Sequence, residues 1–383
     1  MSMTSAKTTP AKTKAAKTKA ARTGSKESAK KDRTKKSRRP DVPVTVVPHG
    51  FGGSEISIGN LVDISFQRTL RVAETGINAL PPGLGLFPLR SVDALGDRVT
   101  ADIRRRGGVI LPIYQREAMW LSFSADVPVA IQIASGLRCA VTGDELENRL
   151  RHRKQNFIDG LAQPWIDGFK TESGEVRQFV AARLGDGATV EEQLSDAEPV
   201  GGVQIVVWEL TDEALERWLQ RRRNWVSDPL DFGVTDCVPF EPGVCYSMSV
   251  ASPSYDMGLG AGGVIKQEIY RSAFSKSDWR SEPSARVWVH LVDANSWTSL
   301  TGEPQPSTPV TAAEYAKWGL PWFDYFDADR VDVDGSPTLA GVKTVGEILG
   351  GYDDGAVMHP AGTPVISLGR TSRPQPVVTP NWD

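Results

Sequence analysis

The sequence predicts an α+β protein rich in β-structure, with antiparallel sandwich or barrel-like sheets, a few short capped helices and a disordered basic N-terminal tail. Three observations predict this class. Apolar and polar residues alternate over runs such as 61–72, which is the period of a strand with one buried face. Several Thr-x-x-Glu segments are typical of helix starts. Long connections rich in Pro and Gly favour antiparallel sheets over a βαβ array.

The first forty residues differ in composition from the rest of the chain. They repeat Ala, Lys and Thr, and their 14 Lys and Arg residues face only Glu27 and Asp32, which gives a net charge of +12. With almost no large apolar side chain, this segment cannot offset its ordering entropy by burial, so we expect disorder. Residues 41–383 keep 30 basic and 45 acidic residues, a net charge of -15. The two parts therefore attract one another or different partners.

This tail resembles the lysine- and alanine-rich tails of linker histones and of some bacterial nucleoid proteins. The resemblance implies sequence-independent, salt-dependent binding to DNA, RNA or another polyanion. A solubilising tail that folds over the acidic body is the alternative. The candidate polyanion-binding residues are Lys12, Lys14, Lys17, Lys19, Lys30, Lys31, Lys35, Lys36, Arg38 and Arg39.

Residues after 41 alternate between strand-like and helix-like patterns. Strands are predicted at 55–58, 61–72, 107–114, 127–137, 202–209, 244–250, 264–270 and 286–292. Helices are predicted from Thr142 to about Phe157, after Thr189, after Thr211 up to Trp225, after Thr311 and after Thr344. The apolar run 81–89 is expected to be irregular, because its prolines lack a donor and its glycines permit positive φ.

Three parts are predicted: the disordered tail 1–40, a larger β-rich domain 41–250, and a smaller β-rich part 251–383 with short helices and an extended C-terminal strap. The boundary is placed in 247–263, which is rich in Ser, Pro and Gly.

The same stretch contains a GxGxxG pattern that begins at Gly258. A dinucleotide site needs a helix after this pattern, and the residues that follow are strand-like, so a glycine-rich connection is predicted and no cofactor is expected.

The stretch 163–182, QPWIDGFKTESGEVRQFVAA, joins a turn, a charged loop and a strand-like run near the middle of the sequence. Asp167 and Glu175 flank its loop, and they are the candidates for general acid–base chemistry on a glycan or a similar polar substrate. Asp167 has no identifiable partner base or metal. A structural role for this stretch, as a turn packed against a sheet, is therefore the alternative.

Four aspartates near the C-terminal end could offer oxygen ligands to a hard cation. They are Asp327, Asp329, Asp332 and Asp334. The spacing of an EF-hand is not met, and Thr338 stands where its bidentate glutamate belongs. A solvated acidic turn is the preferred interpretation, and no metal is expected.

Composition also bears on the compartment. No apolar run approaches the ~18 residues of a membrane span, and no apolar stretch follows the N-terminal charges as in a secretory signal. The three cysteines form no CxxC and leave at least one unpaired. These features predict a cytoplasmic protein without membrane contact.

Five runs carry a second resemblance: PPGLGLFPLRSVDAL, GGVILPIYQREAMWLSF, QPWIDGFKTESGEVRQFVA, MGLGAGGVIKQEIY and GLPWFDYFDAD. Together they resemble a family of uncharacterised microbial β-rich proteins over nearly all of 55–350. The resemblance implies that the body is a self-contained unit and the tail an addition, and it supplies no catalytic residue. The predicted function is a binding or self-assembling structural module, a homo-oligomer, that the tail tethers to nucleic acid or another polyanion. The alternative is a carboxylate-dependent hydrolase acting on a glycan or a similar polar substrate.

Overall fold

The computed structural model describes residues 42–81, 83–225, 257–311, 314, 330–350 and 375–377. Several predictions lie outside these residues: the tail with its candidate lysines and arginines, the strand at 244–250, most of the helix after Thr311, and Asp327 and Asp329. Residues 41–383 form one compact unit, and it is this unit that is described below.

The described part is rich in strands and has few helices, as predicted. The strands are β1 Val44–Pro48, β2 Ser54–Ile58, β3 Val62–Thr69, β4 Ile77–Asn78, β5 Gly83–Leu86, β6 Arg90–Ser91, β7 Val109–Ile113, β8 Ala118–Ser124, β9 Val129–Ser135, β10 Arg138–Cys139, β11 Ile158–Asp159, β12 Trp165–Ile166, β13 Gly168–Lys170, β14 Glu175–Arg183, β15 Val203–Glu209, β16 Met257–Lys266, β17 Ala285–Asp293 and β18 Gln375–Val377. The helices are α1 Ala101–Arg106, α2 Val190–Leu194, α3 Asp212–Trp225, α4 Trp297–Thr301, α6 Pro337–Ala340 and α7 Val345–Leu349, with the 3-10 turns η1 Gly50–Gly52, η2 Val92–Arg98, η3 Lys276–Asp278 and η4 Ala294–Ser296.

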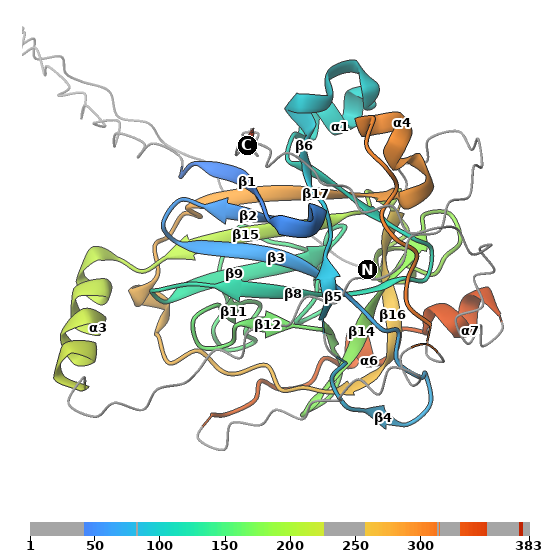
Figure 1. Cartoon of the computed structure of the whole chain (residues 1–383). Helices are drawn as coiled ribbons and strands as arrows, with labels where there is room; N and C mark the ends of the chain where they lie inside the picture. Colours follow the sequence, from blue (N-terminus) through green and yellow to red (C-terminus); the bar gives the residue numbers. More distant parts are fainter. Residues whose placement is uncertain are drawn as a thin grey trace, which may run out of the picture. The chain divides into compact units, whose positions relative to one another are not determined.

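Most strand pairs in this sheet are antiparallel, and two described pairs, β4 with β16 and β7 with β17, are parallel. One group of strands runs in the order β1, β2, β3, β8, β14, β16. A second group runs β7, β17, β15, β9. Strand β16 joins β17 through a single residue pair, Met257 and Leu291. The groups meet at this corner, as Figure 1 shows.

Strand burial differs between the edge and the interior of the sheet, with β7 and β9 buried at every position. The burial of β2 alternates strictly between buried and half-buried positions, which is the pattern that predicted it. The main core takes apolar side chains from both groups of strands, among them Ile64 and Leu121 of the first and Ile131 and Ile205 of the second. Burial of apolar surface between the two groups therefore stabilises the sandwich-like arrangement.

The glycine-rich stretch that begins at Met257 is itself a strand, and the prediction of a connection there was wrong. Strand β16 contains the whole GxGxxG pattern and pairs with β14 over nearly all of its length. A Cβ at Gly260 would lie 2.4 Å from the carbonyl oxygen of Ala188 and 2.5 Å from a methyl group of Val345. Glycine is thus required because α2 and α7 pack directly on this strand.

Strands on either side of the predicted domain boundary hydrogen-bond to each other. The residues before the boundary provide β14 and β15, and those after it provide β16 and β17. The described strands therefore do not divide into two sheets near residue 250. The short strand β5, which pairs with β3, also replaces part of the irregular run predicted at 81–89.

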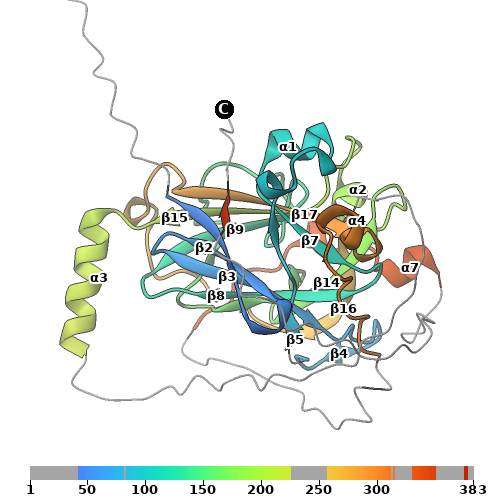
Figure 2. The same ribbon diagram turned by 45° about the horizontal axis from the view of Figure 1, so that its top comes forward.

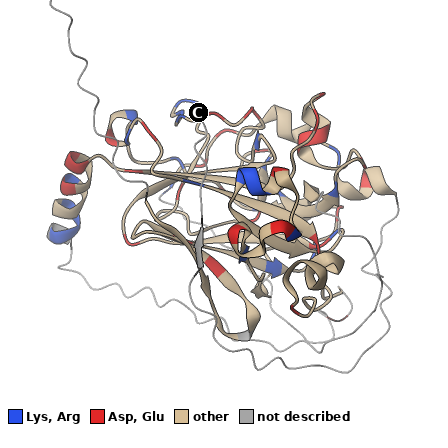
Figure 3. Cartoon of the chain, turned by 90° about the horizontal axis from the view of Figure 1, so that it is seen from above, with Lys and Arg blue, Asp and Glu red and all other residues tan. Residues whose placement is uncertain are grey.

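The capping patterns located three helices correctly. Thr189 and Thr344 each accept a hydrogen bond from the backbone of the glutamate three residues on, and each glutamate bonds back, which completes the boxes that open α2 and α7. Helix α3 has acidic residues in its first turn and basic residues in its last, and it stands at one end of the unit, far from α1, α4 and α7 (Figures 2 and 3). Among the described residues, no helix is long and apolar enough to cross a membrane.

The helix predicted from Thr142 to about Phe157 does not form. Thr142 accepts a hydrogen bond from the backbone of Asp144 instead, and Gly143 between them has a φ of 72°. The Cys139 amide bonds the Asp144 carbonyl, and the Gly143 amide bonds the Cys139 carbonyl. These bonds close a tight turn after β10, and residues 146–157 continue as an irregular loop. The hydrogen bonds of this turn form in place of the helix that the capping pattern predicted.

Candidate functional site

The carboxylate of Asp167 is buried in the turn between β12 and β13. Its Oδ2 accepts a hydrogen bond of 2.7 Å from Nε2 of Gln267, and its backbone amide donates to Oε1 of the same glutamine at 3.0 Å. Burial raises the pKa of Asp167 to about 7, against the opposing effect of the bonds from Gln267 and Trp165. The reciprocal pair with Gln267 fixes the turn against the end of β16, which Gln267 directly follows.

Three other glutamines bind the backbone in the same way. Gln163 donates to the carbonyl of Glu268 and accepts from the amide of Tyr270, and Gln178 does the same with Leu70 and Val72. Gln155 bonds Tyr270 and Ser272. Each side-chain amide donates to a backbone carbonyl and accepts from a backbone amide, which satisfies these buried backbone groups. The stretch 163–182 is therefore held as part of the framework.

Glu175 does not lie beside Asp167. Strand β13 pairs with β14 so that Gly168 faces Gln178 and Lys170 faces Val176. Asp167 precedes the first of these pairs and Glu175 lies beyond the last, so the two candidates occupy opposite ends of the hairpin. In the sheet Glu175 faces Lys266 of β16. The structure does not bring together the pair of carboxylates that acid–base chemistry on a glycan requires.

Of the four candidate cation ligands, the structure describes Asp332 and Asp334. Asp332 accepts several hydrogen bonds, whereas Asp334 is exposed. The carboxylate of Asp332 accepts bonds from Lys170, from Ser173 and from the amides of Gly174 and Ile269. The Asp334 side chain is 90% exposed, with Arg271 at 3.7 Å. Within the described ranges no group of three or more His, Cys, Asp or Glu side chains could hold a metal ion.

The Asp167→Asn variant tests whether this carboxyl is structural. The folded-state pKa of about 7 lies above the unfolded value near 3.9, so the contribution of Asp167 to stability is complete below about pH 4 and is lost as the pH rises through 7. Asparagine resembles the protonated acid and keeps an oxygen for Gln267. We expect the stability advantage of the variant over the wild type to increase by roughly 1–3 kcal/mol between pH 5 and pH 8. Urea unfolding at both pH values measures this, and an advantage that does not increase would contradict it.

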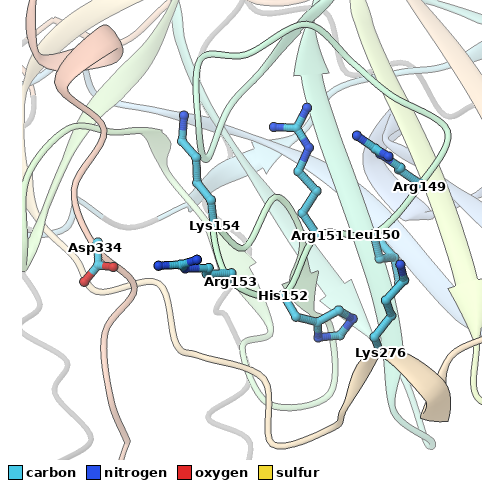
Figure 4. Close-up of a pocket in the computed structure, with 8 residues that line it drawn as sticks. All are labelled: Arg149, Leu150, Arg151, His152, Arg153, Lys154, Lys276 and Asp334. Carbon is cyan, nitrogen blue, oxygen red and sulfur yellow. The ribbon is translucent and has the colours of Figure 1, made fainter.

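The loop that replaces the predicted helix lines a basic hollow with a volume of about 540 Å³, drawn in Figure 4. We define the basic hollow by its lining residues: Arg149, Leu150, Arg151, His152, Arg153, Lys154, Lys276 and Asp334. It gathers five permanent cations and one histidine against one lining carboxylate. This concentration of positive charge lies on a body whose net charge is negative.

Backbone bonds fix the path of the loop around this hollow. The side chain of Asn156 accepts from the amide of Arg151 at 2.8 Å and donates to the carbonyl of Arg149 at 3.1 Å. Gln132 on β9 also donates to the Arg149 carbonyl at 3.0 Å. Beneath the loop, Leu150 packs in a small apolar cluster with Trp208 and Trp279. The charged side chains are therefore presented from an anchored backbone.

Acidic neighbours pair with some of these cations and leave others available. Arg151 bonds Asp144 and Glu147, Arg149 bonds Glu147, and Lys154 bonds Asp144. The remaining two cations, Arg153 and Lys276, are exposed and form no ion pair within the described part of the chain. Arg153 extends toward the side of the hollow on which Asp334 lies (Figure 4). Arg153 and Lys276 can thus bind an external anion.

His152 lines the basic hollow together with Lys276 of η3. Its ring packs edge-on against Phe157 with centroids 5.1 Å apart. Burial and then the nearby charge of Lys276 lower the pKa of His152. The imidazole is accordingly neutral at pH 7, and the charge of the basic hollow comes from its arginines and lysines.

The sequence contained a signal for this hollow that the helix prediction obscured. Residues 149–154 read RLRHRK. Placed within the helix predicted from Thr142 to about Phe157, they carried no binding prediction. The separate contribution of Lys276, 122 residues beyond Lys154, requires the tertiary fold.

No family model, curated protein sequence or solved structure matches this chain.

Proposed function

We propose that this protein is a binding module for polyanions, in which the basic hollow engages acidic groups of a ligand that the N-terminal tail helps to attract. The observation that carries the proposal is the gathering of five permanent cations around one hollow of an acidic body. A polyanion is repelled by most of a surface with net charge -15 and is attracted where cations are concentrated.

The tail and the basic hollow contribute differently to this function. The tail has a net charge of +12 and supplies long-range attraction that depends steeply on salt. The hollow offers Arg153 and Lys276 on an anchored loop and an adjacent turn, which position a bound anion. The tail resembles linker-histone tails in composition, and this supports nucleic acid as the ligand class.

Lys276→Glu in the full chain tests the hollow, and Lys343→Glu is its matched control. Both lysines are exposed, and the two substitutions change the net charge equally. The probe is a fluorescein-labelled single-stranded DNA of about 30 nucleotides, measured by anisotropy at several salt concentrations. We expect Lys276→Glu to weaken binding and to reduce the magnitude of the salt slope by about one, because one phosphate contact is lost. Lys343→Glu should change both values far less.

Removal of residues 1–40 tests the tail separately. We expect most of the affinity at about 0.1 M salt to be lost, with a weak remainder that Lys276→Glu abolishes. Equal effects of Lys276→Glu and Lys343→Glu would contradict a role for the hollow. Undiminished DNA binding by the truncated protein would contradict the role of the tail.

A further inference from the structure

Lys170 is fully buried, which is rare for this residue type. Its relative exposure is 0%, and it lies on β13, where its backbone amide bonds the carbonyl of Ala140. The described atoms around its ammonium group include the carboxylate of Asp332, which belongs to a segment 162 positions later in the chain. The polyanion site does not use this pair.

Backbone bonds fix Asp332 opposite the lysine. Asp332 forms an isolated β-bridge with Tyr270, and the flanking bonds from Val333 to Ile269 and from Arg271 to Val331 measure 2.8 and 2.7 Å. Close behind it, a Cβ at Gly335 would lie 2.7 Å from the Cα of Glu172. The segment is therefore pressed against the β13–β14 hairpin that carries Lys170.

The two reacting groups are already in contact. Nζ of Lys170 lies 2.9 Å from Oδ1 and 2.6 Å from Oδ2 of Asp332, so the nitrogen faces the carboxyl group across both oxygens. A rotation of the carboxyl about its Cβ–Cγ bond would present its face to the nitrogen. Holding the two groups at about 3 Å raises their effective molarity once this rotation has brought the carboxyl face to the nitrogen.

The surroundings suit an acyl transfer. The amide of Ile269 donates to Oδ1 at 2.8 Å, and the amide of Gly174 donates to Oδ2 at 2.6 Å, so each oxygen has a backbone donor in the ion pair from which the reaction starts. The Ser173 hydroxyl donates to Oδ2 at 3.2 Å. Burial lowers the pKa of Lys170, which favours the nucleophilic free amine, while Asp332 and the carboxylates of Glu268 and Glu175 oppose this shift.

Condensation also removes a desolvation cost. Two buried charges are expensive to maintain even when paired, whereas an amide of the same atoms is neutral and keeps its oxygen bonded to a backbone amide. The water that is released enters bulk solvent on the side where Ser173 is exposed.

We propose that Lys170 and Asp332 form an intramolecular isopeptide bond. The Nζ–Cγ bond forms and the Cγ–Oδ2 bond breaks. The ammonium group loses two of its three protons to Oδ2, which leaves as water, while Oδ1 remains as the amide oxygen bonded to Ile269. The starting ion pair contains every atom of the amide and the water, so no oxidant, reductant or co-reactant is needed.

The intact mass of the purified full chain tests this directly. We expect the wild type to be about 18 Da lighter than the mass calculated from its sequence, which is one water. After proteolysis, tandem mass spectrometry should find one branched peptide that joins Lys170 to Asp332. A wild type of unshifted mass would show an ordinary ion pair and overturn the proposal, and this measurement does not depend on any variant folding.

A cyclic imide at Asp334–Gly335 would also remove one water, and Lys170→Arg separates the two reactions. This variant keeps a positive charge beside Asp332 and leaves Asp334 intact. We expect its mass to equal the calculated value and the branched peptide to be absent. A loss of 18 Da that persists in Lys170→Arg, or that maps to Asp334 in the wild type, would overturn the proposal.

Discussion

Replacing Arg68 by Ala should lower the free energy of unfolding by about 3–5 kcal/mol at pH 7, because it leaves a buried carboxylate without its cation. Arg68 on β3 contacts Oε1 of Glu117 through Nε at 2.7 Å and through Nη2 at 2.5 Å. Glu117 is 2% exposed, and its second oxygen accepts from the amide of Tyr114 at 2.9 Å. Arg68 also donates to the hydroxyl and the carbonyl of Ser307 at 2.7 and 2.6 Å, so a connecting segment is released as well.

The defect in Arg68→Ala should become smaller in acid. Burial raises the pKa of Glu117, and Arg68 opposes this shift, so loss of the arginine raises the pKa of Glu117 further. A carboxyl whose folded pKa lies above its unfolded value contributes stability that is complete below the unfolded pKa, about 4.3, and is lost as the pH rises through the folded pKa. The gap between variant and wild type should therefore be narrower at about pH 4.5 than at pH 7 in urea unfolding.

Two further variants control for this interpretation. Arg105 forms an exposed ion pair with Asp102, and Arg105→Ala should cost no more than about 1 kcal/mol. The double variant Arg68→Ala with Glu117→Gln should recover part of the loss, since no charge remains buried. Equal decreases in the free energy of unfolding for Arg68→Ala and Arg105→Ala would show that the buried ion pair contributes no more to stability than the exposed one.

The second large effect is expected at Gly108, the residue before β7. Its φ is 87°, and a Cβ there would lie 2.0 Å from the carbonyl oxygen of Trp288 on the neighbouring strand β17. The obstacle is backbone in the parallel β7–β17 pair, and it cannot move without displacing that pair. Positive φ costs about 1–2 kcal/mol and overpacking about 1–3 kcal/mol, so Gly108→Ala should destabilise the fold by roughly 2–5 kcal/mol.

Two other glycines separate these contributions. Gly187 has a φ of 71°, and a Cβ added there would meet nothing within 4 Å, so Gly187→Ala should show only the conformational cost of about 1–2 kcal/mol. Gly50 has open space and no positive φ, and Gly50→Ala should lie within about 0.5 kcal/mol of the wild type. Thermal or urea unfolding ranks the three variants, and a loss at Gly108 no greater than at Gly187 would remove the steric argument.

The fold class and several elements could be predicted from local patterns. The alternation of apolar and polar residues located β2 and β3, and the capping residues Thr189 and Thr344 located α2 and α7. These patterns can be recognised in the sequence because the side-chain period of a strand and the unsatisfied amides at a helix start both depend on residues close together in the chain. The same reasoning failed for 142–157, where the left-handed Gly143 and the hairpin after β10 compete with the cap.

The candidate sites show the same division. Asp167 was singled out from its neighbours in sequence, but its role depends on Gln267, one hundred residues later, which bonds both its carboxylate and its amide. Asp332 was considered as an acidic turn, and its contact with the buried Lys170 could not be seen from either segment alone. The distance along the chain between these partners leaves no local pattern that sequence reasoning can use.

The sequence by itself determined the β-rich class, the opposite charges of tail and body, and the helices that begin at capping boxes. Composition sets net charge, and periodicity sets which faces can be buried, so both are present in the chain before it folds. Only the tertiary structure showed that 149–154 and Lys276 line one hollow. It also showed that the glycines of β16 leave space for α2 and α7 to pack, and that Lys170 forms an ion pair with Asp332. These features depend on strand pairing between distant segments, because pairing alone brings such side chains within contact distance.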